Sequence, residues 1–264
     1  MNKLKFLLLF TTLGIFTISC NDDQANSRLV IRLTDSPGDY DAVNVDVQSI
    51  EVHRSTGNQE SGWITLSGVN AAVYNLLDLT NGIDVVLADT EFPTGKLSQM
   101  RLVLGDNNTV DIDGEVHHLE TPSALQSGLK LQINETLEEG ITYQFLLDFD
   151  AAKSVVKAGT SGKFNLKPVI KVRTEATSGA IKGFVLPDSL NVAVYAMQGA
   201  DTIVTTYAVE NISEYLLGSL DPGTYDVVFD PGEMSGFLPS TIVGVEVVLG
   251  EVTPNGATTL EKSP

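Results

Sequence analysis

Aspartates around one Pro-Gly turn are the residues best placed to bind a cation. Asp35, Asp39 and Asp41 supply three carboxylates within seven residues, and a second acidic run lies at residues 106–113. Calcium takes about six to eight oxygen ligands, and aspartates on a turn supply several of them. Neither run matches the twelve-residue calcium loop, and aspartate also favours turns for local capping. The sequence therefore predicts no definite metal or other cofactor, with calcium at Asp35, Asp39 and Asp41 as a hypothesis.

Histidine and carboxylate patterns give little support for catalysis. His117 and His118 are adjacent in a predicted strand, so they point to opposite faces, and His53 ends another strand as an expected solvated residue. The chain has no Gly-x-Ser-x-Gly elbow and no His-Glu-x-x-His helix. Residues 159–163 lack the spacing of a phosphate loop and are expected to form a hairpin turn. We predict no catalytic residue and no enzyme. An aspartate-pair hydrolase is the weaker alternative, since the separation of such a pair is a three-dimensional property.

Aromatic side chains offer a second kind of binding site. A glycan could stack on rings of the strands, although these residues also suit a core or a half-buried strand. The candidates are Trp63, Tyr195, Tyr207 and Tyr215. Two short runs, Asp188-Ser189-Leu190 and Asp201-Thr202-Ile203, resemble the O-glycosylation pattern of exported Bacteroidetes proteins. They make Ser189 and Thr202 candidate modification sites.

The amino terminus reads as an export signal. Lys3 and Lys5 precede an apolar run over residues 7–18, and Ser19 stands before Cys20, the single cysteine. This order is typical of a secretory signal, and the run is too short to span about 30 Å of hydrocarbon comfortably. It resembles the bacterial lipoprotein class, in which the cysteine is acylated, for example with palmitate. The following Asp22 and Asp23 resemble the acidic tag that exports Bacteroidetes lipoproteins to the outer-membrane surface.

Charge excludes one class of partner. The chain carries a formal charge of −18. Removing residues 1–19 takes away Lys3 and Lys5 and no acid, which leaves 14 basic and 34 acidic groups, a net of −20. Such a surface repels phosphate backbones, so nucleic acid is excluded as a partner. The basic residues between 153 and 173 are expected to pair with nearby acids such as Asp148 and Asp150.

Period-two alternation predicts a mainly β chain. Val43, Val45 and Val47 point one way, and the phase then shifts by one residue to Ile50 and Val52. A phase shift within one strand predicts a β-bulge near residues 48–49. Short helices are expected at residues 151–157 and 73–79. Composition changes at residues 174–179, a small, polar stretch typical of a linker.

Two family resemblances follow from particular runs. The stretch Leu33-Thr34-Asp35-Ser36-Pro37-Gly38-Asp39-Tyr40, with Leu147-Asp148-Phe149-Asp150-Ala151-Ala152-Lys153, resembles the family called domain of unknown function 4382 over about residues 27–175. The runs Gly179-Ala180-Ile181-Lys182-Gly183 and Leu220-Asp221-Pro222-Gly223-Thr224-Tyr225 resemble the carboxypeptidase-regulatory-like, transthyretin-like domain, which implies a small seven-stranded sandwich within the carbohydrate-binding-like folds. Fold alone does not define function.

Together these observations predict an all-β chain of two β-sandwich domains. The expected parts are a signal peptide (1–19), a lipidated tether (20–27), a first sandwich (28–175) and a second (179–264). We expect a non-enzymatic lipoprotein on the outer membrane, surface-exposed through a lipid on Cys20, that serves adhesion or assembly with envelope proteins. The alternative is a glycan-binding accessory lipoprotein.

Overall fold

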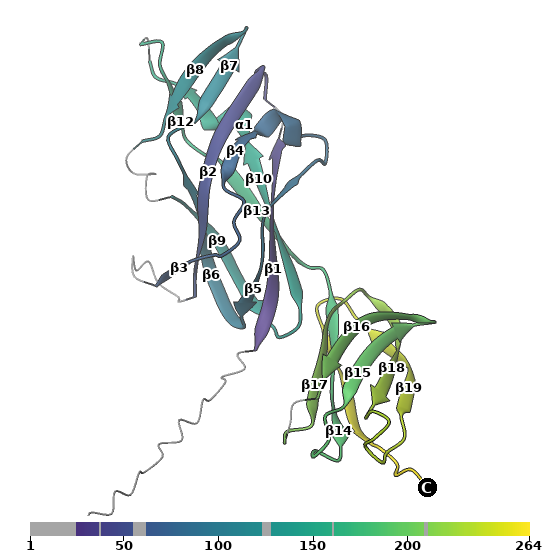
Figure 1. Ribbon diagram of the computed structural model, residues 1–264. Helices are drawn as coiled ribbons and strands as arrows, with labels where there is room; N and C mark the ends of the chain where they lie inside the picture. The colour runs from purple at the N-terminus through teal and green to yellow at the C-terminus, as the bar shows by residue number, and fades with distance from the viewer. Residues whose placement is uncertain (1–24, 37, 55–61, 123–127, 160, 209–210) are drawn as a thin grey trace, which may run out of the picture.

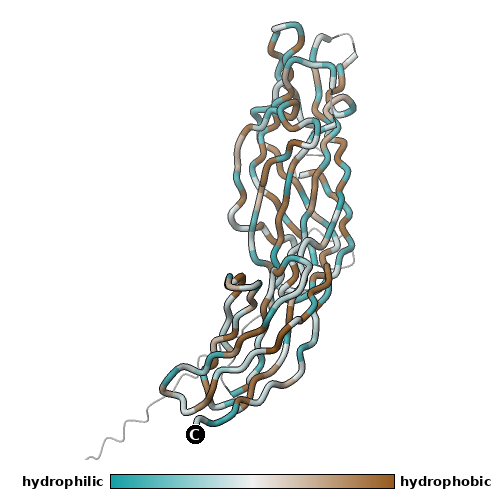
Figure 2. The backbone as a smooth tube through the Cα atoms, turned by 90° about the vertical axis from the view of Figure 1, so that its right-hand side faces the viewer, coloured by the Kyte–Doolittle hydropathy of each residue, from teal (hydrophilic) through white to brown (hydrophobic). Residues whose placement is uncertain are grey.

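The computed structural model describes residues 25–36, 38–54, 62–122, 128–159, 161–208 and 211–264 (Figure 1). Strands dominate these residues and form two groups of sheets, each with its own apolar core. Figure 2 shows apolar residues alternating with polar ones along many of the strands. This alternation places one set of side chains inside each group and the other in solvent. The all-β, sandwich fold predicted from the sequence is confirmed.

The first sandwich opposes a four-stranded sheet to a larger one. The four-stranded sheet has the order β13-β10-β1-β5, in which β1 runs parallel to β10. Its bounds are β1 (Asn26–Ser36), β5 (Val85–Pro93), β10 (Thr142–Asp150) and β13 (Ile170–Ala176). Leu29, Ile31 and Leu33 alternate inward from β1 and are fully buried. The central pair β1 and β10 therefore anchors the core.

The opposing sheet contains nine strands. Its main path is β11-β12-β8-β7-β2-β6-β9, and β3 and β4 pair with β2. The bounds are β2 (Ala42–His53), β3 (Trp63–Thr65), β4 (Ala72–Asn75), β6 (Gly95–Leu104), β7 (Thr109–Ile112), β8 (Glu115–Glu120), β9 (Leu129–Leu137), β11 (Val155–Lys157) and β12 (Phe164–Leu166). The register between β2 and β6 shifts between Val47 and Ser49. This confirms the predicted bulge, which lets Val47 and Ile50 both face the core.

The second sandwich has the seven strands expected from the sequence. One sheet has the order β17-β14-β20, with β14 parallel to β20, and the other has the order β16-β15-β18-β19. The bounds are β14 (Gly179–Leu186), β15 (Ala193–Gln198), β16 (Asp201–Tyr207), β17 (Glu214–Leu220), β18 (Gly223–Asp230), β19 (Ser240–Val247) and β20 (Val252–Thr259). Tyr225, Val227 and Phe229 alternate inward from β18, as predicted.

Both predicted helices are shorter than expected. The first, α1 (Ala151–Ser154), makes one turn after the Asp150 cap, and β11 begins at the next residue, Val155. The second is the 3-10 turn η1 (Leu76–Leu79), which follows β4. In both places tertiary strand pairing overrides a short helical pattern. Among the described residues, the structure contains no helix with the length and apolarity needed to cross a membrane.

The polar stretch at residues 174–179 is not a free linker. Residues 174–176 belong to β13 and pair with β10, and β14 begins at Gly179. Only Thr177 and Ser178 lie between the strands, and Ser178 is buried. Small, polar composition suggested a flexible segment, but backbone pairing to β10 holds it extended. The chain therefore passes directly from one sandwich into the other.

Candidate functional site

The two sandwiches contact each other through backbone and side-chain polar groups. It is built on the turn between β9 and β10, where Gly140 adopts φ +74°. The Tyr143 hydroxyl supports this turn, since it donates to Thr136 O and accepts from Glu138 N, each at 3.0 Å. The turn is therefore fixed before it meets the second sandwich.

Backbone groups cross the junction directly. Ser219, on β17, adopts φ +55°, which directs its N–H to Gly140 O at 2.8 Å. Its hydroxyl lies 3.1 Å from the Thr142 hydroxyl. A left-handed serine is strained by about 1 kcal/mol or more. The strained backbone of Ser219 therefore lies at the contact between the sandwiches.

Ser178 ties the crossing point to both sandwiches. Its hydroxyl accepts from Thr142 N at 2.8 Å, and its carbonyl accepts from Gly250 N at 2.9 Å. Thr177 N donates to Thr142 O at 2.8 Å. These three hydrogen bonds hold the crossing segment against β10 and against the turn at Gly250.

One cation bridges the junction. Lys182 Nζ lies 3.0 Å from a carboxylate oxygen of Glu139 in the first sandwich and 3.0 Å from one of Glu214 in the second. Burial lowers the pKa of Lys182, but the two carboxylates outweigh that effect and leave the pKa raised. The ammonium group is therefore charged at neutral pH and links the two sandwiches.

A cavity of about 500 Å³ opens beside this contact, bounded by β1, β5, β17 and the Gly140 turn. Arg28 and Asp89 form a two-bonded ion pair at its wall, with N–O distances of 2.8 and 2.7 Å. This hydrogen-bonded pairing lowers the pKa of Asp89 and raises that of Arg28. Glu91 and Glu139 also line the cavity, so most of its charged groups are acidic.

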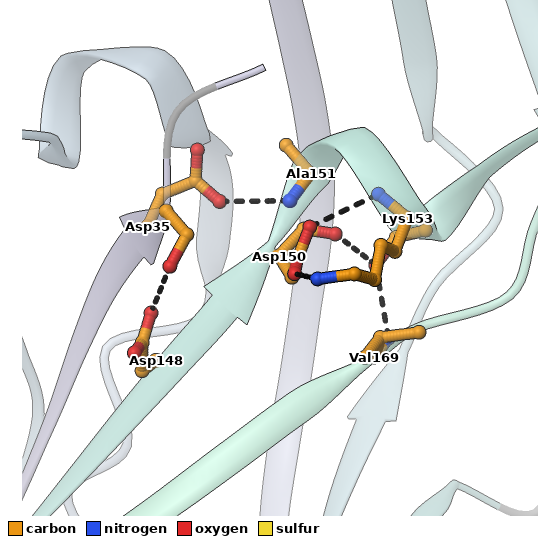
Figure 3. A network of polar contacts seen from close by, with 8 residues as sticks. Asp35, Asp148, Asp150, Ala151, Lys153 and Val169 are labelled. Carbon is orange, nitrogen blue, oxygen red and sulfur yellow. Dashed lines mark hydrogen bonds and ion pairs between the residues drawn. The ribbon is translucent and has the colours of Figure 1, made fainter.

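Asp35 lies at the end of β1, close to Asp148 and Asp150 at the end of β10 (Figure 3). Its Oδ1 accepts from Ala151 N at 3.0 Å, at the start of α1. Asp150 caps the same turn by accepting from Lys153 N, and it also pairs with Lys153 Nζ. Asp148 accepts from the Ser36 hydroxyl at 2.9 Å. These carboxylates hold the end of β1 against the end of β10.

The second oxygen of Asp35 has no hydrogen-bond partner among the described residues, and the residue is only 6% exposed. Burial raises the pKa of Asp35 to about 7, and the negative charges of Asp150 and Asp148 add to the rise. The bond from Ala151 N works in the other direction. Asp35 therefore titrates near neutral pH.

The structure does not bring the three aspartates of the calcium hypothesis together, although Asp39 and Asp41 line one pocket. Asp35 faces Ala151, Asp39 is exposed, and Asp41 accepts from Gly114 N at 3.1 Å. Within the described ranges no group of three or more His, Cys, Asp or Glu side chains is placed to hold a metal ion. In the second acidic run, Asn107 donates two hydrogen bonds to the carboxylate of buried Asp46. These bonds give the loop a structural role.

The histidines follow the predicted strands with one correction. His117 and His118 are adjacent in β8, and the His117 ring packs on Phe164 at a centroid distance of 5.0 Å. His53 ends β2 as predicted, but it is fully buried rather than solvated. Its ring lies 5.1 Å from that of Trp63, since β3 folds back over the end of β2.

Two of the four candidate stacking rings are covered. The Arg101 guanidinium lies 4.0 Å from the centre of the Trp63 ring, and Tyr215 is buried with its hydroxyl bonded to Asn255. Burial raises the pKa of Tyr215. Tyr195 is half-buried and Tyr207 is 60% exposed. The strand register pairs Tyr207 with Ala193 and Tyr195 with Thr205, which places both tyrosines on the outer face of one sheet.

The modification candidates differ in placement. Ser189 is exposed in a turn, and Thr202 is exposed in β16. Cys20, Asp22 and Asp23 lie outside the described residues. In the basic run, Lys153 pairs with Asp150, and Arg173 lies 3.7 Å from Asp148, as expected. Position 160 of the predicted turn lies outside the described residues; on either side of it β11 and β12 pair antiparallel, and Ala158 N donates to Lys163 O at 2.8 Å.

Sequence reasoning missed the junction residues. Gly140, Ser178 and Ser219 belong to no motif, and the family run that contains Lys182 gave no indication of its partners Glu139 and Glu214. One weak signal existed: Glu139-Gly140 reads as a turn between two predicted strands. That turn gave no indication of what it would contact.

The fold and the contact between the sandwiches define an all-β protein of two sandwiches that meet through polar groups. The chain belongs to the family described as domain of unknown function (DUF4382), whose model matches residues 26–168. This range covers the first sandwich up to the start of β13, as the sequence resemblance indicated. A search of curated proteins found no match.

Among solved structures, the TIE protein of Bacillus anthracis aligns with 12% identity and a TM-score of 0.26, over 90% of this chain and 34% of that one. This chain thus spans about a third of the TIE protein. The minor pilin GBS52 of Streptococcus agalactiae aligns with 10% identity and a TM-score of 0.23, over 90% and 96% of the two chains. The C-terminal fragment of the pilus adhesin SpaC from Lactobacillus rhamnosus GG gives 8% identity and a TM-score of 0.25, over 90% and 98%. TM-scores of this size do not establish a shared fold.

Proposed function

We propose that this chain is a non-enzymatic assembly module, displayed on the outer-membrane surface by a lipid on Cys20. The observation that carries the proposal is the position at which the tether would enter the fold. β1 begins at Asn26, whose carbonyl accepts from Gly140 N at 2.9 Å, at the junction of the sandwiches. An anchor at Cys20 would therefore act on both sandwiches together.

Chain length makes the attachment close. Each residue spans at most about 3.4 Å, so the stretch from Cys20 to Asn26 reaches about 20 Å at most. The contacts of Ser178, Ser219 and Lys182 would keep the sandwiches in one arrangement near the membrane. Their exposed strands would then be presented to neighbouring envelope proteins in a constant orientation, which favours an assembly role over a mobile catalytic one.

Palmitate labelling and surface accessibility test this proposal in cells. The wild-type chain should incorporate labelled palmitate and be cleaved by protease added outside intact cells. Cys20→Ser should lose both properties, and Ser189→Ala is a control that should keep them. Chemical crosslinking should join the wild-type chain, but not Cys20→Ser, to other outer-membrane proteins. Equal labelling of wild type and Cys20→Ser would contradict the proposal.

Glycan binding is the second candidate, supported by the two tyrosines on the outer face of the β16-β15-β18-β19 sheet. Tyr195 and Tyr207 occupy diagonal positions on adjacent strands, within reach of one ligand ring system. Affinity electrophoresis in gels containing polysaccharide tests this function. Tyr195→Ala should abolish retardation, whereas Phe184→Ala, an exposed aromatic on the other sheet, should not. No retardation of the wild-type chain on a broad polysaccharide panel would eliminate the candidate.

A further inference from the structure

Two Asn-Gly pairs occur in the chain, Asn81-Gly82 and Asn255-Gly256. An asparagine followed by glycine is reactive, because the next backbone nitrogen can attack the side-chain amide and glycine has no Cβ to obstruct it. The reaction is intramolecular, so its rate depends on whether the local backbone can bring the two groups together. The two pairs lie in different surroundings, and the structure therefore distinguishes them as reaction sites.

Asn81 and Gly82 form an exposed turn between η1 and β5. Their φ values are +58° and +83°, and Ile83 N donates to Thr80 O at 3.1 Å across the turn, the conformation that Asn-Gly favours. Among the described residues, the Asn81 side chain has no hydrogen-bond partner. A Cβ placed on Gly82 would have no described atom within 4 Å beyond its chain neighbours. Opening this turn therefore breaks one exposed backbone hydrogen bond.

The turn can open without disturbing the sheet beneath it. The Thr34 hydroxyl on β1 lies 2.9 Å from both Leu79 O and Ile83 O, in the residues that flank the turn. These contacts hold both ends, while residues 80–82 lie beyond them and are exposed or half-buried. Segments held by few buried contacts open most readily. The backbone rotation needed for the attack is therefore confined to the turn.

The Asn255-Gly256 pair is held on several sides. It lies inside β20, and β14 pairs with the residues on both sides of it. Asn255 Nδ2 donates to the Tyr215 hydroxyl at 2.8 Å, and Tyr215 is buried. A Cβ placed on Gly183 of β14 would lie 2.8 Å from Gly256 O, so the two backbones are in close contact. Rotation of this pair would break strand pairing and a hydrogen bond to a buried hydroxyl, which costs more than opening an exposed turn.

We propose that Asn81 is a site of spontaneous deamidation and that Asn255 is protected from it. Gly82 N attacks Asn81 Cγ, forms an N–C bond and expels the side-chain nitrogen as ammonia, which leaves a five-membered succinimide. Water then opens the ring. Cleavage of the bond from Cγ to nitrogen gives aspartate, and cleavage of the bond from the backbone carbonyl to nitrogen gives isoaspartate. Water is the sole co-reactant, and no oxidation or reduction takes place.

Peptide mapping of the full chain by mass spectrometry tests the proposal. During incubation of the folded chain in mildly alkaline buffer, aspartate and isoaspartate should accumulate at position 81 about tenfold faster than at position 255. In guanidinium chloride, which removes the difference in surroundings, the two pairs should react at similar rates. Equal rates at the two positions in the folded chain, or an Asn81 that reacts only after unfolding, would overturn the proposal.

Two variants assign the product to its position. Asn81→Gly removes the side-chain amide and suits the positive φ of this residue, so the fold should be kept. Isoaspartate in the whole folded chain, measured with a methyltransferase specific for that residue, should nearly disappear in this variant. Asn255→Ala is the matched control and should keep the wild-type signal. An isoaspartate signal that survives Asn81→Gly, or that is lost in Asn255→Ala, would overturn the assignment to Asn81.

Discussion

Gly218 packs directly against Gly140, and no side chain fits between them. A Cβ atom on Gly218 would lie 2.9 Å from Gly140 Cα and 3.0 Å from Gly140 O. Real side chains do not approach backbone so closely, so the two sandwiches meet at a contact between bare backbones. This approach brings Ser219 N within hydrogen-bond distance of Gly140 O and Lys182 within reach of Glu139.

Gly218→Ala should force the two sandwiches apart. We expect a loss of about 1–3 kcal/mol, because the obstacle is backbone that cannot move aside. Small-angle scattering should show a wider distribution of inter-sandwich distances. Gly223→Ala is the matched control, since its Cβ would meet only the flexible side chain of Gln198 at 3.3 Å and that of Tyr225 at 3.9 Å. Unchanged scattering and melting for Gly218→Ala would show that the contact is not rigid.

Lys182→Met should leave Glu139 and Glu214 without their shared cation. The Lys182 side chain is about a third exposed, so the expected loss is small, about 1 kcal/mol. Thermal unfolding at low salt should show it, and 1 M NaCl should reduce the difference from wild type because salt screens the pair. Lys182→Arg keeps a positive charge and should therefore retain most of the wild-type stability. A salt-independent effect would indicate lost packing instead.

Asp35→Asn should change the pH dependence of stability. Because the folded pKa is raised from 3.8 to about 7, the native state holds this proton more tightly than the unfolded chain does. The resulting stabilisation is complete below about pH 4 and is lost as pH rises towards 7. At about 1.4 kcal/mol per pKa unit, the variant should exceed wild type by a few kcal/mol at pH 8 and match it at pH 4.

Urea unfolding at the two pH values measures this difference. Asp39→Asn is the control, since Asp39 is exposed and should alter stability little at either pH. Parallel pH profiles for wild type and Asp35→Asn would refute the assignment of the titration to Asp35.

Arg101→Met should expose the single tryptophan. The Arg101 guanidinium covers the Trp63 ring at 4.0 Å and pairs with Glu51 at 3.1 Å, and its side chain is 9% exposed. We expect a loss of about 2 kcal/mol and a red shift of the emission. Arg54→Met, at a more exposed guanidinium, should leave the emission unchanged. If an added glycan quenched the Trp63 emission of the wild-type chain, that result would contradict the covered position of the Trp63 ring.

Local pattern predicted much of the fold but little of the site. Alternation and its phase shift near residue 48 located β2 and its bulge, because side-chain direction follows directly from strand geometry. Burial of His53 escaped prediction, since it depends on β3 folding back from a separate part of the chain. The four-residue α1 was overestimated because pairing of β11 with β12 competes with helix.

The order of residues by itself determined that this is an all-β chain in two parts, since period-two alternation and turn residues act locally. Only the tertiary structure decided which groups meet: Gly140 with Gly218, Asp35 with Ala151, and Lys182 with a carboxylate from each sandwich. It also decided that β16 is a sheet edge, because an edge is defined by sheet order. Such contacts join residues far apart in the chain, and no local period encodes them.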